Sequence, residues 1–383
     1  MKVVIIIPTY NEKDNIEYIY SEITKYSPKD IDLKILFVDD ESPDGTAEVI
    51  KTLQKKNKNI FLISGKKNGL GAAYVRGFDY AIKELNAEVV FEMDADGSHK
   101  PQYVSAMVSA IKNGADVAVG TRYIKGGSIP SDWGIHRKIQ SSLGNIVARV
   151  ILLAPQFHDM TTGFRATKTE YLKKIDYHNL FSNRFSYKIH LVYALYKSGA
   201  KIKEVPIEFI DREKGHSKIQ KNEIIDSLRV VILVSIKYHS ELIKFLITGV
   251  VGYLVNAITL SVATTFFRSA HSVDGLSGLI PAIKDTPLFM ATLLSGEMSI
   301  VTIFLINNFW TFRYRKVGGS VFTRFIKFNI TALGSPLIQI LVINTLTPYF
   351  GIHKQISLAI GVILGLALNW ILNTKVIWRK KSS

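Results

Sequence analysis

Two aspartates one residue apart, Asp94 and Asp96, follow a short apolar run and are well suited to metal chemistry. Residues two apart in a strand point to the same face, so a strand that stops here can direct both carboxylates to one point beyond the sheet. Two neighbouring carboxylates repel each other unless a cation or a proton lies between them. A hard divalent ion such as Mg²⁺ or Mn²⁺, which can also hold substrate phosphates, fits this arrangement. Asp and Gly are common turn residues as well, so the triplet alone leaves a polar turn equally open.

Polar residues also follow the other apolar runs in the first half of the chain. We expect strands at 3–7, 33–38, 60–63, 89–93 and 116–119, separated by segments with helical periodicity. This alternation predicts an α/β domain whose sheet is mostly parallel and covered on both faces. Such sheets bind ligands at the carboxyl ends of their strands. The residues expected at that edge are Tyr10, Glu12, Asp39, Asp40, Asp94, Asp96 and Arg122.

A dinucleotide-binding oxidoreductase is the obvious alternative for such a sheet. It requires Gly-x-Gly-x-x-Gly after the first strand, so that the pyrophosphate rests on a helix N-terminus. The first strand is followed instead by Pro8-Thr9-Tyr10-Asn11-Glu12, and the pair Gly69 and Gly71 comes after the third strand. The sequence therefore argues against hydride transfer.

Several motifs, taken together, resemble one family of enzymes. They are Pro8-Thr9-Tyr10-Asn11-Glu12, Val38-Asp39-Asp40-Glu41-Ser42-Pro43-Asp44-Gly45-Thr46, Met93-Asp94-Ala95-Asp96-Gly97-Ser98-His99, Gly120-Thr121-Arg122-Tyr123, Asp159-Met160-Thr161-Thr162-Gly163-Phe164-Arg165 and Asp211-Arg212-Glu213-Lys214-Gly215-His216-Ser217-Lys218. In this order, over roughly the first 225 residues, the chain resembles the dolichyl- or polyprenyl-phosphate mannose synthases. These are inverting glycosyltransferases of the GT-A fold. Gly97 departs from the family, in which many members carry a larger apolar residue there.

The resemblance implies a role for each matched residue. The nucleoside would be held by Pro8, Tyr10, Glu12, Val38 and Asp40. Asp94 and Asp96 would bind Mg²⁺ or Mn²⁺ on the donor diphosphate, with Ala95 and Ser98 lining the site. The phosphates of donor and acceptor would be met by Arg122, Arg137, Arg212 and Lys218. We expect Asp96, Arg122 and Arg137 to be the catalytic residues, and His99 to be structural.

The implied acceptor determines the mechanism that we expect. Most inverting transferases need a general base to deprotonate a hydroxyl, whereas a lipid phosphate is already ionised near neutral pH. We therefore expect transfer of mannose from GDP-mannose to dolichyl or polyprenyl phosphate without a catalytic base. Nearby cations and hydrogen bonds should lower the pKa of Asp40, Asp94 and Asp96.

Composition points to a membrane rather than to nucleic acid as the partner. The 383 residues carry a formal net charge of +16, and no cysteine is available for a disulfide or a thiolate. Charges are frequent before about residue 230, and four long apolar stretches follow. We expect a GT-A domain at 1–225, an amphipathic interface helix or linker at 226–240 and a membrane domain of four helices at 241–383.

The apolar stretches are each long enough to span the hydrocarbon core of a bilayer. We place the spans at about 242–267, 287–312, 325–350 and 356–377. A faint repeat, in which Phe245 corresponds to Phe328 and Asn307 to Asn373, indicates two related helix pairs. A four-span module of this kind resembles the GtrA-like membrane domains. Lys and Arg concentrate after the second and fourth spans, which predicts an integral membrane protein with a cytoplasmic catalytic domain.

Three other functions remain open at this point. The donor could be UDP-glucose, although Gly126-Gly127-Ser128, Trp133 and Arg137 look more like the mannose synthases. The four spans could move a lipid-linked sugar across the bilayer, with Glu297 as an ionisable group within a span. A processive polysaccharide synthase shares the paired aspartates, but the Gln-x-x-Arg-Trp-type motif of those enzymes is not present in the sequence.

Overall fold

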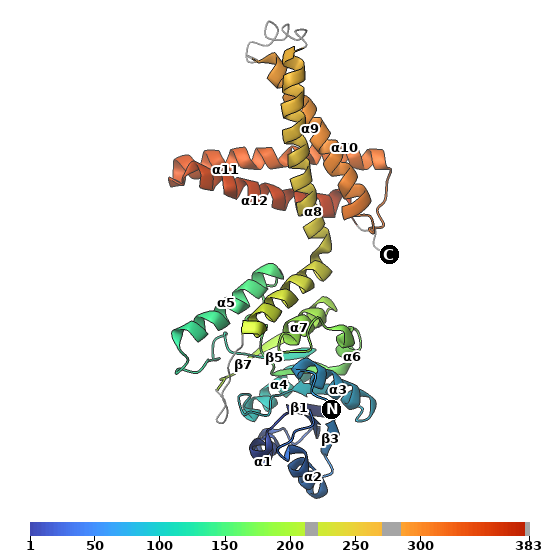
Figure 1. Ribbon diagram of the computed structural model, residues 1–383, viewed down its shortest axis with the longest axis vertical. Coiled ribbons are helices and arrows are strands. Elements are labelled where there is room, and N and C mark those ends of the chain that lie inside the picture. The colour runs from blue at the N-terminus through green and yellow to red at the C-terminus, as the bar shows by residue number, and fades with distance from the viewer. Residues whose placement is uncertain (211–220, 270–284, 380–383) are drawn as a thin grey trace. The chain divides into compact units, whose positions relative to one another are not determined.

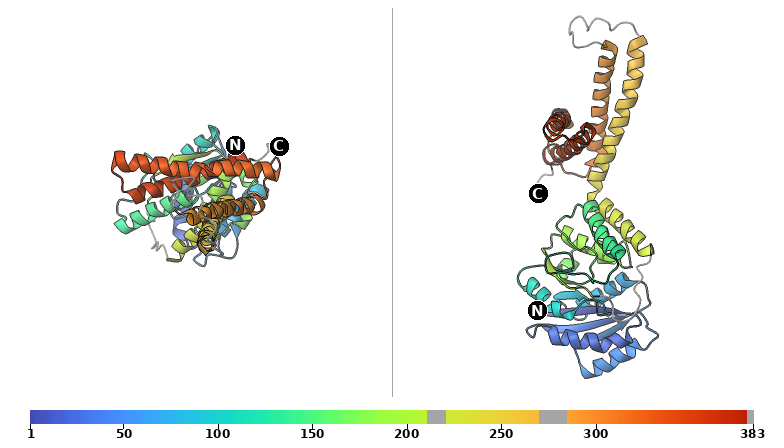
Figure 2. Two further views of the ribbon diagram at one scale, coloured as in Figure 1. Left: turned by 90° about the horizontal axis from the view of Figure 1, so that it is seen from above. Right: turned by 90° about the vertical axis from the view of Figure 1, so that its left-hand side faces the viewer.

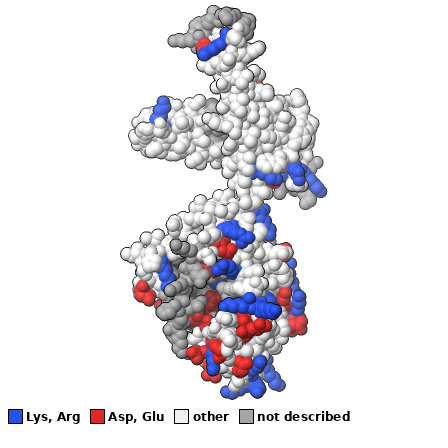
Figure 3. All heavy atoms as spheres, viewed as in Figure 1, with Lys and Arg blue, Asp and Glu red and all other residues white. Residues whose placement is uncertain are grey.

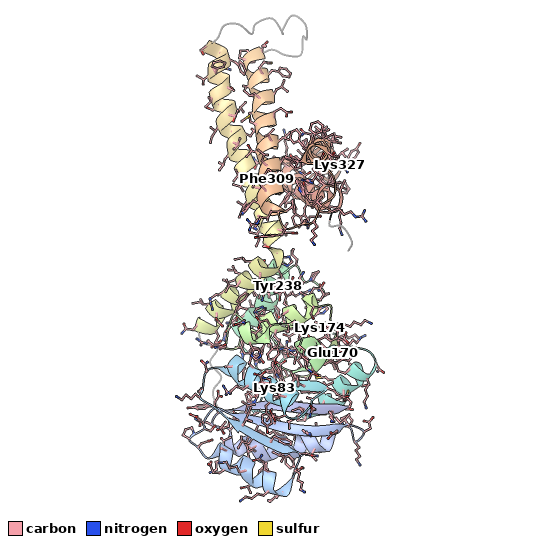
Figure 4. The ribbon with its side chains drawn as sticks, turned by 90° about the vertical axis from the view of Figure 1, so that its right-hand side faces the viewer. Lys83, Glu170, Lys174, Tyr238, Phe309 and Lys327 are labelled. Atoms are coloured by element: carbon pink, nitrogen blue, oxygen red, sulfur yellow. The ribbon has the colours of Figure 1, made fainter. Side chains whose placement is uncertain are left out.

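The computed structural model describes residues 1–210, 221–269 and 285–379 (Figure 1). The chain divides into two compact units, Met1–Tyr238 and His239–Ser383. The division falls within helix α8 (Lys221–Ser269), whose backbone leaves the helical region at His239 with φ −120° and ψ 23°. Tyr238, the last residue of the first unit, is labelled in Figure 4. The boundary lies inside the predicted linker at 226–240.

The first unit is built on one sheet. Within the described residues, seven strands pair in the order β3-β2-β1-β4-β6-β5-β7, and all are parallel to their neighbours except β6. The strands are β1 (Lys2–Thr9), β2 (Asp32–Asp39), β3 (Ile60–Ser64), β4 (Val89–Glu92), β5 (Val117–Thr121), β6 (Arg165–Lys168) and β7 (Ile202–Pro206). The prediction of a mostly parallel sheet is confirmed.

Helices cover both faces of this sheet (Figure 2). They are α1 (Ile16–Tyr26), α2 (Thr46–Lys56), α3 (Leu70–Lys83), α4 (Val104–Lys112), α5 (Ile135–Ile151), α6 (Thr169–Leu172), α7 (Tyr187–Lys197) and the first part of α8. Alternate residues of a strand face opposite sides, and β1 shows the consequence. Val4 and Ile6 belong to the core that includes α3 and α7, whereas Ile5 packs in the core that includes α1, α2 and α4.

Two strands were not expected from the sequence. Strand β6 is short and polar, and it runs antiparallel between β4 and β5. Strand β7 pairs in parallel with β5 at the edge of the sheet. Because Arg165 of β6 pairs with Glu92 of β4, the Asp159–Arg165 motif lies next to the paired aspartates.

Helices α5 and α8 present apolar side chains to the surface of the first unit. On α5 the buried residues are Asn145 and Ala148, while Ile135 is 76% exposed and Val150 66% exposed. The first part of α8 buries Val230, Val231 and Val234 in the core but exposes Ile225 and Ile232. Both helices are therefore amphipathic, with one apolar face left uncovered by the described residues.

Among the described residues, four helical segments that lie wholly or partly in the second unit are long and apolar enough to cross a membrane. They run over Asn222–Ser269, which begins in the first unit, and over Thr286–Thr311, Val321–Phe350 and Lys354–Ile377. Their helices are α8, α9 (Thr286–Ile306), α10 (Val321–Ala332), α11 (Gly334–Phe350) and α12 (Lys354–Leu372). The third predicted span is thus two consecutive helices, α10 and α11. Figure 3 shows little charge on the corresponding surface.

The internal repeat is visible in the structure of this unit. Asn307 and Asn373 each begin a short π-helical turn at the end of α9 and α12. The carbonyl of Asn307 accepts the N–H of Phe312 at 2.9 Å, and that of Asn373 accepts the N–H of Trp378 at 2.8 Å. Phe245 and Phe328 lie in one aromatic cluster with Phe312 and Trp378. The second helix of each pair therefore ends in the same kind of π-helical turn.

Candidate active site

Asp94 and Asp96 lie in the turn that follows β4, because the strand ends at Glu92, earlier than expected. The Tyr74 hydroxyl donates to Asp94 Oδ1 at 3.0 Å. Asp96 Oδ1 accepts both the backbone N–H of Ser98, at 3.0 Å, and its hydroxyl, at 2.6 Å. Hydrogen bonds from Tyr74 on α3 and from Ser98 within the turn, rather than strand alternation, therefore orient the two carboxylates.

His99 stabilises this turn through a hydrogen bond to its backbone. Its Nδ1 accepts the backbone N–H of Asp94 at 3.0 Å, so that nitrogen carries no proton, and its ring stacks on Phe164 at 5.1 Å between centroids. Burial lowers the pKa of His99, which favours the neutral ring even with Asp94 Oδ2 3.8 Å away. The geometry agrees with the structural role expected for this residue.

A cavity of about 610 Å³ opens beside the aspartate turn. One part of its wall is polar and carries Asp94, Asp96, Ser98, Arg122 and Arg137. Apolar residues of α5 and α8 also line it. They are Leu143, Val147, Ile224, Leu228 and Val231. The cavity wall therefore combines charged groups with hydrocarbon side chains.

Arg122 is fixed by a carboxylate that the sequence analysis did not assign. Its Nε and Nη2 donate to the two oxygens of Asp159 at 2.6 and 2.8 Å, and Nη2 also donates to Thr161 Oγ1 at 2.8 Å. Burial alone would raise the pKa of Asp159, but the adjacent Arg122 outweighs it and holds that pKa below its usual value. Asp159 positions Arg122 and offsets much of its charge.

Arg137 reaches the same cavity from the first turn of α5. Its guanidinium carbon lies 4.0 Å from the centroid of the Trp133 ring, a geometry for cation–π attraction. Trp133 is itself buried and lines the cavity. Two of the residues predicted to meet phosphates, Arg122 and Arg137, therefore line one cavity with the paired aspartates.

The five residues predicted to hold the nucleoside lie at the ends of β1 and β2. Tyr10 is exposed, and Lys67 Nζ sits 3.2 Å from the centroid of its ring. Glu12 accepts from Asn15 Nδ2 at 2.6 Å. Val38 pairs in register with Pro8, and its side chain is fully buried. Ala95 in the aspartate turn is buried as well, so neither Val38 nor Ala95 is exposed at the surface.

Asp40 is buried and forms an ion pair with Arg76. Burial raises the pKa of Asp40, and this effect exceeds the opposite effect of Arg76. The expectation that its pKa is lowered was therefore wrong, because burial had not been foreseen. Lys67 and Arg76 are two cations at this edge that the sequence analysis did not single out.

Two predicted phosphate-binding residues, Arg212 and Lys218, lie outside the described residues. The structure adds Lys188, on α7, to the wall of the cavity. No motif identified it, because it stands in a run of apolar and aromatic residues. Its position next to Asp94 follows from tertiary packing alone.

Behind the aspartate turn lies a buried ion pair between Glu92 and Arg165. Glu92 accepts from Arg165 Nε at 2.6 Å and Nη2 at 2.8 Å, and from the Tyr187 hydroxyl at 2.7 Å. Strand β6 thus joins β4 through side chains as well as through its backbone. This pair fixes the end of β4 from which the aspartate turn begins.

The carboxylates near the cavity suit a metal ion whose remaining coordination positions are filled by the substrate and water. Among the described residues, no three His, Cys, Asp or Glu side chains gather as a metal site. Asp94 and Asp96 provide two carboxylates on one cavity. Mg²⁺ typically takes one or two carboxylates and fills its remaining positions with water and substrate phosphates. The residues present therefore fit such an ion.

The comparisons with known proteins agree with this arrangement. Residues 4–176 match glycosyl transferase family 2, and residues 244–378 match the GtrA/DPMS transmembrane domain. A dolichol-phosphate mannosyltransferase of Pyrococcus furiosus is 32% identical over 384 residues, which cover 99% of each chain. A polyprenol monophosphomannose synthase of Mycolicibacterium smegmatis is 37% identical over 59% of this chain and 84% of its own. An undecaprenyl-phosphate mannosyltransferase of Micrococcus luteus is 34% identical over 57% of this chain and 88% of its own.

The fold and the site define a glycosyltransferase with a GT-A-like catalytic unit and a helical membrane domain. The chain belongs to the dolichol-phosphate mannosyltransferase family. The family and the GtrA-like membrane domain expected from the sequence motifs are both confirmed.

Proposed function

We propose that this protein transfers mannose, with inversion, from GDP-mannose to dolichyl or another polyprenyl phosphate. The observation that carries the proposal is a cavity wall that combines charged and hydrocarbon side chains. Its arginines and carboxylates suit a diphosphate, a sugar and a lipid phosphate, while Leu143, Leu228 and Val231 suit a hydrocarbon chain. A soluble sugar acceptor would gain nothing from an apolar wall.

The uncovered faces of α5 and α8 support a lipid acceptor. Their exposed apolar residues are Ile135, Ile139, Leu143, Ile146, Val150, Ile224, Ile225, Leu228, Ile232 and Ile236. Amphipathic helices of this kind lie in the plane of a membrane surface with their apolar faces in the lipid. In Figure 3 the region of α5, at the upper left of the catalytic unit, is largely free of charge. An acceptor could then enter the cavity directly from the bilayer.

Mannose as the transferred sugar is supported by the names of the three relatives. The exposed ring of Tyr10 can stack on a base, and the Asp40 carboxylate can accept a hydrogen bond from a base or a ribose. GDP is proposed from the family resemblance. UDP-glucose is the alternative that the assay below distinguishes.

Asp94 and Asp96 would hold Mg²⁺ or Mn²⁺. Such an ion would neutralise the donor diphosphate and stabilise the departing nucleotide. Tyr74 and Ser98 keep the two carboxylates in place through the hydrogen bonds described above. Arg122 and Arg137 would offset the charge of two phosphate groups brought close together.

The reaction needs no proton transfer to begin. An oxygen of the acceptor phosphate attacks the anomeric carbon of mannose, a new carbon–oxygen bond forms, and the bond to the donor diphosphate breaks. The electron pair leaves with the nucleoside diphosphate. Because the nucleophile is already an anion, catalysis rests on positioning and on charge stabilisation.

We propose that the catalytic unit faces the cytoplasm. Lys and Arg concentrate between α9 and α10 and at the start of α10, at Arg313, Arg315, Lys316, Arg324 and Lys327. Lys327 is labelled in Figure 4. Excess positive charge in short loops marks the cytoplasmic side. This side is where sugar nucleotides are available.

The test is a donor screen with membranes that contain the protein and added polyprenyl phosphate. Labelled lipid is expected from GDP-mannose, and little from UDP-glucose. Membranes that carry an Asp96→Asn chain provide the matched background. Labelled lipid from UDP-glucose alone would replace the proposed donor, and lipid labelled by neither donor would contradict the proposed function.

A further inference from the structure

Lys188 is a cation in the cavity whose place the motifs do not explain. It is the second residue of α7 and is 1% exposed. Its Nζ lies 3.7 Å from Asp94 Oδ2 and 4.3 Å from the centroid of the Phe185 ring. Lys188 thus brings a third positive charge beside Arg122 and Arg137.

The fold makes room for this side chain at Gly163. A Cβ at that position would lie 2.2 Å from Lys188 Nζ and 2.7 Å from its Cε. Any larger residue would force the end of the lysine to move. Gly163 therefore keeps the amino group at the wall of the cavity.

If Lys188 served only as the counter-charge of Asp94, a shorter, hydrogen-bonded contact between the two side chains would be expected. The distance of 3.7 Å is longer than a hydrogen bond, and within the described part of the chain Nζ makes none. A buried charge is costly unless it is both paired and hydrogen-bonded. The amino group of Lys188 therefore has hydrogen-bonding capacity that a ligand in the cavity could use.

The position of Lys188 selects the kind of ligand. Its neighbours Phe185 and Ile189 line the cavity, together with Leu228 and Val231 on α8. The lysine therefore adjoins both the Asp94 carboxylate and apolar residues of the cavity wall. A lipid phosphate whose chain lies along that wall would place its phosphate group there.

We propose that Lys188 binds the phosphate of the lipid acceptor and holds it next to the metal-binding carboxylates. This assignment rests on the proposed function, because it takes the acceptor to be a lipid phosphate. Arg122 is paired with Asp159, so Lys188 adds to the positive charge that Arg122 can still offer a phosphate. A lysine serves here as a point charge that tolerates several phosphate orientations.

The test measures binding to the full chain in detergent, without donor and without metal. The probes are farnesyl phosphate and farnesol, and the readout is the ratio of their affinities. We expect Lys188→Met to lower this phosphate preference by about ten- to a hundredfold, the range for a hydrogen bond to a charged group. Lys188→Arg should retain part of it. Lys197→Met, at the exposed far end of the same helix, is the matched control and should retain all of it.

Binding of GDP with Mn²⁺ separates this role from a structural one. It should be unchanged in Lys188→Met if the lysine serves the acceptor. If Lys188→Met does not fold, Gly163→Ala displaces the amino group while keeping the charge, and it should lower the phosphate preference too. An unchanged preference in the folded variants, or an equal loss of GDP and Mn²⁺ binding, would overturn the assignment.

Failure of the proposed function gives a different pattern. If the wild-type protein prefers farnesyl phosphate through Lys188 but transfers no mannose, the phosphate site is supported and the proposed function is contradicted. Wild-type protein that transfers mannose while Lys188→Met keeps its phosphate preference would retain the function and remove the site.

Discussion

Replacing Asp96 by Asn is expected to lower mannose transfer by about a thousandfold, because a metal ion supplies several kcal/mol of charge stabilisation. The amide keeps nearly the shape of the carboxylate, and its oxygen can still accept from Ser98. The turn should therefore survive while the negative charge is lost. Initial rates at saturating donor, together with Mn²⁺ binding followed by electron paramagnetic resonance, measure the two consequences.

Asp30→Asn is the matched control for this substitution. Asp30 is an exposed aspartate that pairs with Lys112 at the surface, so its loss should change neither rate nor Mn²⁺ binding. A chelator in excess should reproduce the Asp96→Asn defect in wild-type protein. Full activity in the chelator would contradict the metal role of the paired aspartates.

Glu92→Gln is expected to lower the free energy of unfolding of the catalytic unit by about 3–5 kcal/mol, the cost of removing one partner from a buried ion pair. Glu92 and Arg165 are both 1% exposed, and Arg165 would keep its charge without a counter-charge. The glutamine could accept from Arg165 or Tyr187, but it carries no charge. Urea unfolding of the full chain in detergent, read by hydrogen exchange of peptides from β4 and β6, measures the loss in this unit.

Glu208→Gln provides the comparison for Glu92. Glu208 pairs with Lys100 at 2.6 Å but is half exposed, and exposed pairs contribute about 0–1 kcal/mol. Its unfolding midpoint should stay close to that of the wild type. Equal midpoints for the two variants would mean that the buried pair does not hold β4 and β6 together.

Much of the catalytic unit could be predicted from its apolar runs. The buried strands β1, β2 and β4 can be recognised in the sequence as continuous hydrophobic segments, and polar residues follow each of them. Strand β6 could not be found in this way, because Arg-Ala-Thr-Lys has no apolar period. Arg165 is buried only because Glu92, distant in the sequence, neutralises it.

In the site, too, residues within motifs could be predicted, whereas residues placed only by tertiary packing could not. Asp94, Asp96, Arg122 and Arg137 were found from motifs, and all four line the cavity. Lys188 was missed because a lysine in a helix normally points to solvent, and only the packing of α7 against the aspartate turn buries it. The raised pKa of Asp40 was missed for the same reason, since burial cannot be read from its motif.

The acceptor test is the most direct measure of the central claim, that the lipid phosphate is itself the nucleophile. Purified full chain would be given GDP-mannose with polyprenyl phosphate, with polyprenol, or with a phosphonate acceptor of shifted second pKa. We expect label only on the two ionised acceptors. The rate of mannose transfer should rise with pH as the acceptor phosphate gains its second negative charge, at a pH of about 6. With the phosphonate, this rise should move by the shift in the acceptor's pKa. Transfer to polyprenol, or a rise that stays fixed when the acceptor changes, would show that an enzyme group acts as the base.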